Sequence, residues 1–417
     1  MSETELNNRR GFLKTSALSM LSLIGISQTK LMAQGVDFSN FKTLTDDDLF
    51  SQIRSELVIP ANRVYLNTGT LGPTPKFIID KVTELTNRLE ANPAGENFGP
   101  MGQEMEVTRS KAAKFINADL EEIILTRNTT EGISIVCSAI DWKAGDEILT
   151  TNHEHGGAET GLDFLNATKG AVIKKIQMPY PVQNKKQILD LVKAHITEKT
   201  KLLLLSHVET VTGLRMPIKE ISDIARSKAI MFIVDGAQAP GMININVQDL
   251  GCDVYAFSGH KWVMGPKETG IVFIRKSIQE KINNVFLTGG YSSYSRSSGT
   301  RNAPNIIGFG DIMDWHEKIG KDRIEKRCLD LARYCQDNLK NIKGLKVITT
   351  DVPGLSTAIV SVSLDNVSNR EVYNRMREKD IIVKTLPQYN ALRFSNHMFT
   401  TNKDVDRMVS VLKKILV

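Results

Sequence analysis

Between residues 123 and 274 the chain repeats one pattern, in which a short apolar run is followed by a stretch with helical spacing. The runs at 202–205 (LLLL) and 231–234 (MFIV) are apolar at every position. Strands that do not alternate apolar and polar residues are typical of parallel sheets covered on both faces. The pattern predicts an α/β fold with a mostly parallel sheet. Its strands are expected at residues 123–125, 147–150, 171–178, 202–206, 231–235, 254–257 and 271–274.

The pattern changes after residue 305, where a long helix with a charged face is expected to run to about residue 339. Short strands and helices follow, and together they predict a second, smaller α/β domain. A chain of 417 residues suits two domains. These further elements are expected at 37–59 (a short helix and linker), 67–75 (a Gly/Pro-rich loop), 76–90 (helix), 347–348 and 358–362 (strands), and 369–378 and 403–416 (helices).

Charge and cysteine content exclude several classes of protein. The net charge of +6 is mild for this length, and no block of like charges stands out, so we expect no nucleic-acid partner. The four cysteines include no CxxC pair, so no zinc or redox motif and no metal site are expected.

The first 33 residues have the features of an export signal. Paired arginines at 9–10, followed by GFLK, resemble the bacterial twin-arginine signal. The apolar stretch 17–26 would span about 15 Å as a helix, half a bilayer core, and therefore predicts a signal peptide rather than a membrane span. The implied partner is the twin-arginine translocase and the implied location is the periplasm. Tethering remains open if the signal stays uncleaved, because the match to a cleavage site is weak.

Three motifs at strand ends carry chemistry. Asp235 ends an apolar strand and is followed by small residues (234–241, VDGAQAPG). Lys261 follows the strand at 254–257 in the motif SGHKWVMGP. Hydroxyls at 127–132 (RNTTEG) stand where a helix begins, and a helix N-terminus suits a phosphate. An acid, a lysine and a phosphate cradle are the parts that a pyridoxal phosphate (PLP) enzyme requires.

The spacing of 26 positions (261 − 235) between the acid and the lysine, with the two motifs around them, resembles the class V aminotransferase family. The isopenicillin N epimerase-like and cysteine desulfurase-like members resemble this chain most. The resemblance implies fold type I of the PLP-dependent transferases, with a seven-stranded, mostly parallel sheet between helices. It also implies a homodimer. The expected domains are a signal peptide (1–33), an N-terminal segment that packs with the small domain (34–75), a large PLP-binding domain (76–300) and a small C-terminal domain (301–417).

The resemblance also implies roles for individual residues. Lys261 would form the Schiff base and move the substrate proton, Asp235 would pair with the pyridine nitrogen, and Gln238 would reach the ring oxygen. Arg393 would receive the substrate α-carboxylate. His155 would stack on the ring, with His153 as the alternative. The remaining assignments are phosphate contacts from Thr129, Thr130, Ser258 and His260, a phosphate contact across the dimer from Thr300, and a substrate contact from Asn67.

Two departures from the family pattern matter. Where relatives often carry Asn after the His-Val pair, this chain has Glu209 and Thr210, so the Thr210 hydroxyl is expected to replace an amide next to the cofactor. No Cys follows Cys335, so the thiolate that cysteine desulfurases use is missing from the loop at 383–390. Cys328 and Cys335 would lie about 10 Å apart on one helix, too far apart for a disulfide.

The expected function is PLP-dependent chemistry at the α-amino group of an amino acid or a metabolite that contains one. Transamination is the first expectation, and epimerisation or β-lysis remains open because all three share their early steps. A non-catalytic binding protein that retains the fold is a third hypothesis, which the intact Lys261 and Asp235 disfavour.

Overall fold

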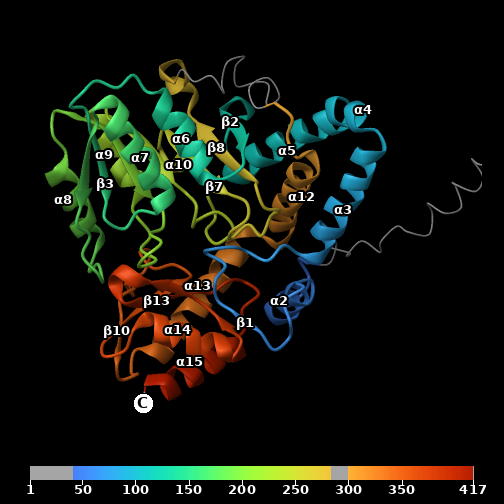
Figure 1. Cartoon of the computed structure of the whole chain (residues 1–417), viewed down its shortest axis with the longest axis vertical. Helices are drawn as coiled ribbons and strands as arrows, with labels where there is room; N and C mark the ends of the chain where they lie inside the picture. Colours follow the sequence, from blue (N-terminus) through green and yellow to red (C-terminus); the bar gives the residue numbers. More distant parts are fainter. Residues whose placement is uncertain (1–40, 283–298, 417) are drawn as a thin grey trace, which may run out of the picture. The chain divides into compact units, whose positions relative to one another are not determined.

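The computed structural model describes residues 41–282 and 299–416 (Figure 1). The expected twin-arginine signal at 1–33 lies outside the described residues. The described chain forms one sheet of seven strands, the large sheet, and one of four strands, the small sheet.

The large sheet has the order β2-β8-β7-β6-β5-β3-β4, and only β8 runs in the opposite direction to the other six strands. Leu202, Leu203, Leu204 and Leu205 are all fully buried, which explains the uninterrupted apolar run in β5. The predicted seven-stranded, mostly parallel sheet is confirmed. Its strands are β2 (Ile123–Thr126), β3 (Glu147–Thr151), β4 (Val172–Ile176), β5 (Thr200–Ser206), β6 (Met231–Asp235), β7 (Val254–Ser258) and β8 (Gly270–Ile274).

Helices cover both faces of the large sheet (Figure 1). On one face, α6 (Thr129–Ala139) and α7 (Gly156–Lys169) share a buried cluster with alternate sheet residues such as Ala256. On the other, the ring of Phe257 lies 6.5 Å from those of Phe115 and Phe309. Those two phenylalanines belong to α5 (Pro100–Ile116) and α12 (Ala303–Ile319). The other helices around the sheet are α3 (Lys76–Ala91), α4 (Pro93–Phe98), α8 (Lys185–His195), α9 (Ile218–Ser227) and α10 (Val247–Leu250).

The small sheet is antiparallel, in the order β12-β13-β10-β9. One face packs on helices α14 (Asn369–Glu378) and α15 (Asn402–Leu416), and it includes the alternate residues Leu392 and Phe394 of β13. Arg393, between them, therefore projects from the opposite face. The strands are β9 (Leu345–Val347), β10 (Ile359–Leu364), β12 (Lys384–Leu386) and β13 (Ala391–Ser395).

A short parallel pair joins an early segment of the described chain to a late one. β1 (Val64–Tyr65) pairs with β11 (Ile381–Ile382), and Val64 lies in the same buried cluster as the helices of the small sheet. Before β1, helix α2 (Asp46–Ser55) begins at Thr45, whose side chain caps the helix by accepting a hydrogen bond from Asp48.

The prediction of a single long helix at 305–339 is wrong. The chain forms α12 up to Ile319 and α13 (Lys321–Leu339), separated by Gly320 with φ +97°. A residue without Cβ adopts that backbone conformation readily. The helix therefore ends at Gly320 and a new one begins, although the apolar periodicity of the sequence continues. Within residues 41–282 and 299–416, no helix combines the length and apolar character that crossing a bilayer requires.

Candidate active site

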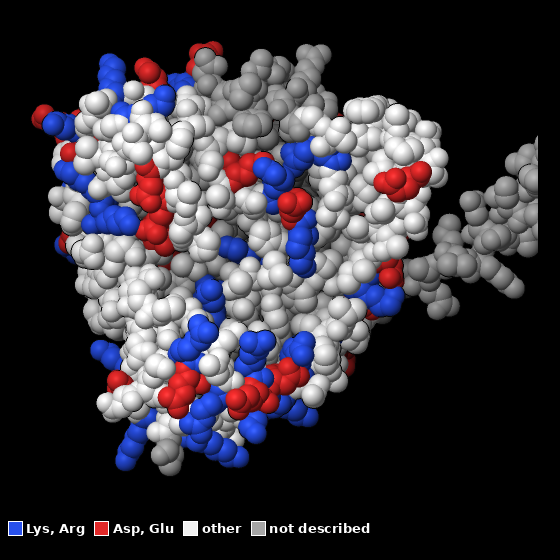
Figure 2. Space-filling view, viewed as in Figure 1, with Lys and Arg blue, Asp and Glu red and all other residues white. Residues whose placement is uncertain are grey.

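Several predicted functional residues lie at the carboxyl edge of the large sheet. β5, β6 and β7 are neighbours, and the register aligns Ser206 with Asp235 and Asp235 with Ala256. Lys261 follows the end of β7 by three residues. The ends of adjacent parallel strands are where α/β sheets bind ligands. Figure 2 shows Lys and Arg side chains gathered around a hollow near the centre of one face of the molecule.

Lys261 is buried, with 9% of its surface exposed. Burial lowers its pKa to about 8; the charge of Asp235 raises this pKa and that of Arg393 lowers it. Asp235 is itself 4% exposed and accepts a 2.8 Å hydrogen bond from the Ala237 N–H. A buried amine whose pKa lies near neutrality can lose and regain a proton, which a base in catalysis must do.

Helix α6 begins in a cradle of hydroxyl groups. The Ser258 hydroxyl accepts a 3.0 Å hydrogen bond from the Thr129 N–H and lies 2.8 Å from the Thr129 hydroxyl. A Cβ added to Gly157 would lie 2.4 Å from Thr130 Oγ1, so the starts of α6 and α7 approach each other closely. The positive end of this 11-residue helix and these hydroxyls together suit a phosphate group.

His155 and His153 have different surroundings, although two positions separate them. His155 is exposed and caps α7, accepting a 3.0 Å hydrogen bond from the Gly157 N–H at Nδ1. Burial and then the charge of Lys261 lower the pKa of His155. His153 is fully buried, 2.8 Å from Glu209 Oε2. His155 is exposed and feels the charge of Lys261, whereas His153 is buried against Glu209. His155 is therefore the better candidate of the two for the predicted ring contact.

Gln238 is held by three hydrogen bonds. Its amide donates to Gly69 O at 2.8 Å and to Thr210 Oγ1 at 3.4 Å, and its carbonyl accepts from Trp262 Nε1 at 2.7 Å. A Cβ added to Gly69 would lie 2.8 Å from Gln238 Oε1, so only glycine fits this close approach without a shift. Gln238 is thus fixed beside Thr210, next to the end of the strand that carries Asp235.

Arg393 is a buried cation that forms no ion pair with a carboxylate of the described residues 41–282 and 299–416. It is 2% exposed, and burial lowers its pKa to about 10. Its guanidinium donates to the Thr210 hydroxyl at 2.6 Å, to Thr210 O at 3.2 Å and to the Thr70 hydroxyl at 3.1 Å. Its Nε has no partner among the described residues, nor do the neighbouring hydroxyls of Ser395 and Ser361. Unpaired buried donors around a cation indicate a site for an anion.

The other predicted site residues differ in position. Asn67 accepts a 2.7 Å hydrogen bond from the Thr70 hydroxyl and forms a β-bridge with Ser395, so it lies beside Arg393. The His260 carbonyl accepts a hydrogen bond from the Gly72 N–H at 2.7 Å, and burial lowers the pKa of His260 to about 4. Thr300 is exposed, and the structure brings it to no other predicted site residue. Its contact with a phosphate across a dimer stays a prediction.

The sequence did not single out Glu154, a buried acid that directly precedes the site residue His155. Glu154 is 7% exposed and accepts hydrogen bonds from the Ser206 hydroxyl at 2.6 Å and the Thr151 hydroxyl at 2.8 Å. Burial raises its pKa to about 8, and the negative charges of Asp235 and Glu209 contribute in the same direction. The position of Glu154 directly before His155 was the one available signal.

All four cysteines are free and buried, and burial raises the pKa of each thiol to about 12. At neutral pH each is therefore a protonated thiol inside the protein, without the nucleophilic character of a thiolate.

Comparisons with known proteins agree with this geometry. The family model for aminotransferase class-V matches residues 64–408. The chain is 26% identical over 377 residues to an isopenicillin N epimerase from Amycolatopsis lactamdurans, covering 84% of this chain and 94% of the relative. It is 30% identical over 383 residues to a probable cysteine desulfurase from Halalkalibacterium halodurans, covering 84% of this chain and 92% of the relative.

Solved structures share the fold. A C-DES mutant with glycine covalently linked to its PLP cofactor aligns with a TM-score of 0.79 at 24% identity, covering 86% of this chain and 98% of that chain. A complex of the cystine C-S lyase C-DES with cysteine persulfide aligns with a TM-score of 0.77 at 24% identity, covering 85% and 98%. The fold is therefore that of the fold type I PLP-dependent enzymes.

The residues of this chain fit the cofactor. A buried lysine of lowered pKa lies within the field of a buried acid, and a hydroxyl-lined helix start lies at the same sheet edge. Beside them the buried guanidinium of Arg393 retains an unpaired donor. With the match over residues 64–408, these features identify the chain as a member of the class V aminotransferase family of PLP-dependent enzymes.

Proposed function

We propose that this enzyme acts on the α-amino group of an amino acid, or of a metabolite that contains one, and that its reaction is transamination. The observation that carries the proposal is the pairing of Lys261, a buried amine of lowered pKa, with Arg393, a buried cation that has an unpaired donor. The charge of Arg393 lowers the pKa of Lys261, and the charges of Arg393 and Lys261 both lower the pKa of His155. This electrostatic coupling supports the idea that Arg393 and Lys261 act on one ligand.

Arg393 would bind the α-carboxylate of the substrate. A planar guanidinium matches a carboxylate with two parallel hydrogen bonds. The bonds to Thr210 and Thr70 fix the orientation of the group before a ligand arrives, so little side-chain entropy is lost on binding.

Lys261 would remove the α-proton from the substrate and, on the same face, transfer it to the cofactor carbon that bonds the substrate nitrogen. PLP supplies an electron-withdrawing ring that stabilises negative charge at the substrate carbon. Asp235 would bind the pyridine nitrogen, and Thr129, Thr130, Ser258 and His260 would hold the phosphate. Transamination moves the proton with a single group, and Lys261 meets that requirement.

Epimerisation is the second candidate, and one observation favours it. It requires a proton donor on the opposite side of the substrate. His155 accepts a hydrogen bond at Nδ1, so we infer that its neutral ring carries its proton on Nε2. One of the relatives is an isopenicillin N epimerase. β-Lysis remains a third possible outcome of the same early steps.

Sulfur transfer through a cysteine persulfide is not part of the proposal. Burial raises the pKa of all four thiols to about 12, and the loop before Arg393 contains no cysteine. A desulfurase that stores sulfur on its own thiolate would need an accessible thiol of low pKa.

The test is a screen of purified holoenzyme with amino acids, followed by cofactor absorbance and product analysis. Transamination converts the amino acid into a keto acid while the amino group passes to the cofactor, so an added keto acid is supplied as the acceptor for repeated turnover. Epimerisation inverts the configuration without a mass change, and lysis removes the β-substituent. Lys261→Ala should abolish turnover, whereas Lys346→Ala, an exposed lysine on the far edge of the small sheet, should not. A holoenzyme whose spectrum responds to no amino compound would favour the binding-protein hypothesis instead.

His155→Ala separates the two candidate reactions. If His155 donates the second proton, the variant loses inversion while Lys261 still exchanges the α-proton with deuterium from the solvent. If transamination is the reaction, keto acid formation continues in the variant at a reduced rate.

We further propose export by the twin-arginine route and a homodimer to which Thr300 contributes across the interface. Both rest on the resemblance of the sequence. Replacing Arg9 and Arg10 by lysine should retain the enzyme in the cytoplasm, as fractionation would show. Light scattering on the purified holoenzyme measures its oligomeric state.

A further inference from the structure

The face of the small sheet that carries Arg393 carries a second cation. β12 and β13 pair so that Lys384 lies directly opposite Arg393, and Leu386 lies opposite Ala391. Side chains of directly paired residues project from the same face of a sheet, with Cβ atoms about 4.5–5.5 Å apart. Lys384 therefore projects from the same face as the guanidinium expected to bind the α-carboxylate.

That face is turned toward the active site. Leu386 and Ala391, the next pair on the same face of the two strands, pack in a buried cluster with Val211. Val211 follows Thr210, whose hydroxyl accepts the hydrogen bond from Arg393. The helices that cover the small sheet pack on the opposite face, through Leu392 and Phe394. Lys384 thus extends along the site rather than into the core of the small sheet.

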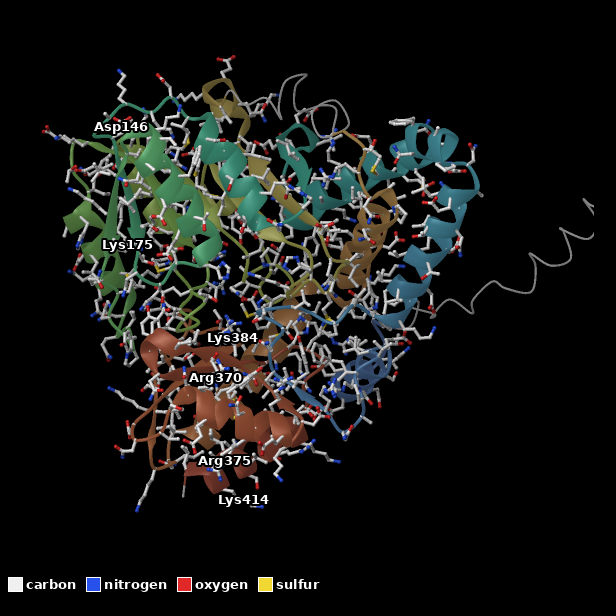
Figure 3. The ribbon with its side chains drawn as sticks, viewed as in Figure 1. Asp146, Lys175, Arg370, Arg375, Lys384 and Lys414 are labelled. Atoms are coloured by element: carbon white, nitrogen blue, oxygen red, sulfur yellow. The ribbon has the colours of Figure 1, made fainter. Side chains whose placement is uncertain are left out.

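Lys384 is exposed, and the described residues include no carboxylate within ion-pair distance of it. By contrast, Lys174 and Lys175, on the edge strand of the large sheet, pair with Glu147 and Glu159. Figure 3 shows Lys384 on the side of the small sheet that meets the large sheet, with Arg375 and Lys414 at the far side. The positive charge of Lys384 also reaches His155, where it contributes to lowering the histidine pKa.

We propose that Lys384 binds a second anionic group of the substrate, so that the enzyme prefers α-amino acids with an acidic side chain. This inference rests on the proposed function, because it takes Arg393 as the α-carboxylate site. Arg393 would bind one carboxylate while Lys384, beside it and nearer to solvent, binds the other. A Lys ammonium suits this second position, because its flexible stem can follow anions at different distances from the α-carbon.

Two pairs of amino acids of nearly equal shape make the test sharp, glutamate with glutamine and aspartate with asparagine. Each is titrated into the holoenzyme, and the dissociation constant is read from the change in cofactor absorbance. The wild type should bind the acid of each pair more tightly than the amide. This preference should fall as the salt concentration rises, because the charge at Lys384 is exposed to solvent.

Lys384→Gln should lower the ratio of amide to acid dissociation constants by about two- to fivefold, the range expected for one exposed ion pair. Lys384→Glu should lower it further, and Lys384→Arg should restore it. Lys346→Gln is the matched control, because Lys346 is an exposed lysine on β9, at the opposite edge of the same sheet. That control should keep the wild-type ratio.

Each failure has a distinct reading. A wild type that binds acid and amide equally, or a Lys384→Gln variant that weakens both by the same factor, overturns the acidic-substrate inference while the proposed function stands. A holoenzyme whose spectrum responds to no α-amino acid overturns the proposed function, and the inference with it.

Discussion

The hydroxyl of Thr210 lies 2.6 Å from Nη1 of Arg393, and the two residues are 183 positions apart in the chain. The same hydroxyl is 3.4 Å from the Gln238 amide, so one small side chain connects two predicted ligand-binding groups. Thr210 is also the residue whose hydroxyl we expected in place of the amide that relatives often carry there.

Removing this hydroxyl should weaken substrate binding while the cofactor stays bound. Hydrogen bonds to charged groups contribute about 1.5–3 kcal/mol, so Thr210→Val should lower kcat/KM for amino acids about tenfold or more. Thr210→Ser retains the hydroxyl and should restore most of the loss. Steady-state kinetics with cofactor absorbance as a loading control checks this. Equal kinetics in Thr210→Val and the wild type would remove Thr210 from the site.

Lys261 should destabilise the apoprotein at neutral pH. Its folded-state pKa is about 8, below the ordinary value of 10.5. Below pH 8 the Lys261 amine is protonated in both the folded and the unfolded state. The folded state then bears the full free-energy cost of burying this charge, about 3 kcal/mol. Between pH 8 and 10.5 the unfolded state binds more protons, so stability rises with pH.

Lys261→Met should therefore stabilise the apoprotein at pH 7, and the difference from the wild type should shrink as the pH approaches 10.5. Urea unfolding of both apoproteins across this range measures it, with Lys346→Met as the control for loss of a surface charge. A difference that stays constant with pH would contradict the lowered pKa.

Glu154 should behave in the opposite sense. Burial raises its pKa from 4.5 to about 8, so the folded state binds more protons than the unfolded state between these values. Stability should fall as the pH rises through this window, by up to about 5 kcal/mol from this one group. Glu154→Gln mimics the protonated acid and should remove that pH dependence.

Thermal or urea unfolding at pH 5 and pH 8 tests this prediction for the wild type and Glu154→Gln. Glu154→Ala is the contrasting variant, because it leaves the Ser206 and Thr151 hydroxyls without their acceptor and should be destabilised at both pH values. If the wild type and Glu154→Gln respond to pH alike, Glu154 titrates at its ordinary pKa.

The thiols should be inert in the native protein. All four cysteines are buried and their pKa is raised to about 12, so a thiol reagent such as dithionitrobenzoate should react with none of them at pH 8 before unfolding. Four should react in denaturant. Labelling that proceeds in the native state at the same rate as substrate turnover would reopen the sulfur-transfer hypothesis.

The sequence predicted those parts of the site that lie close to a strand end. Asp235 and Lys261 could be found because each follows an apolar run and is flanked by small residues, and parallel strands place their ends together. The mostly parallel sheet followed from the same runs, and the resemblance to the family implied that it has seven strands. The structure brings both residues to one edge of the sheet, and their assigned roles remain predictions.

What could not be predicted depends on contacts between distant segments. The pair His153–Glu209 joins positions 56 apart, and neither residue carries a local signal that it faces the other. Lys384 was missed because an exposed lysine is ordinary until its strand register is known. The break at Gly320 was missed because the apolar spacing of a helix continues on both sides of it.

The β1–β11 pairing has a consequence for the time at which the site forms during synthesis. The ion pair between Arg63 and Asp380, which flank this pairing, joins residues 317 positions apart at 2.7 Å. At 5–20 residues per second, the ribosome needs about 16 to 60 s to deliver the second partner after the first. The loop that follows β1 contributes Asn67, Gly69 and Thr70 to the site. The binding site is therefore completed only after Asp380, and Arg393 beyond it, have left the ribosome, and loading of PLP into a finished site must follow that point.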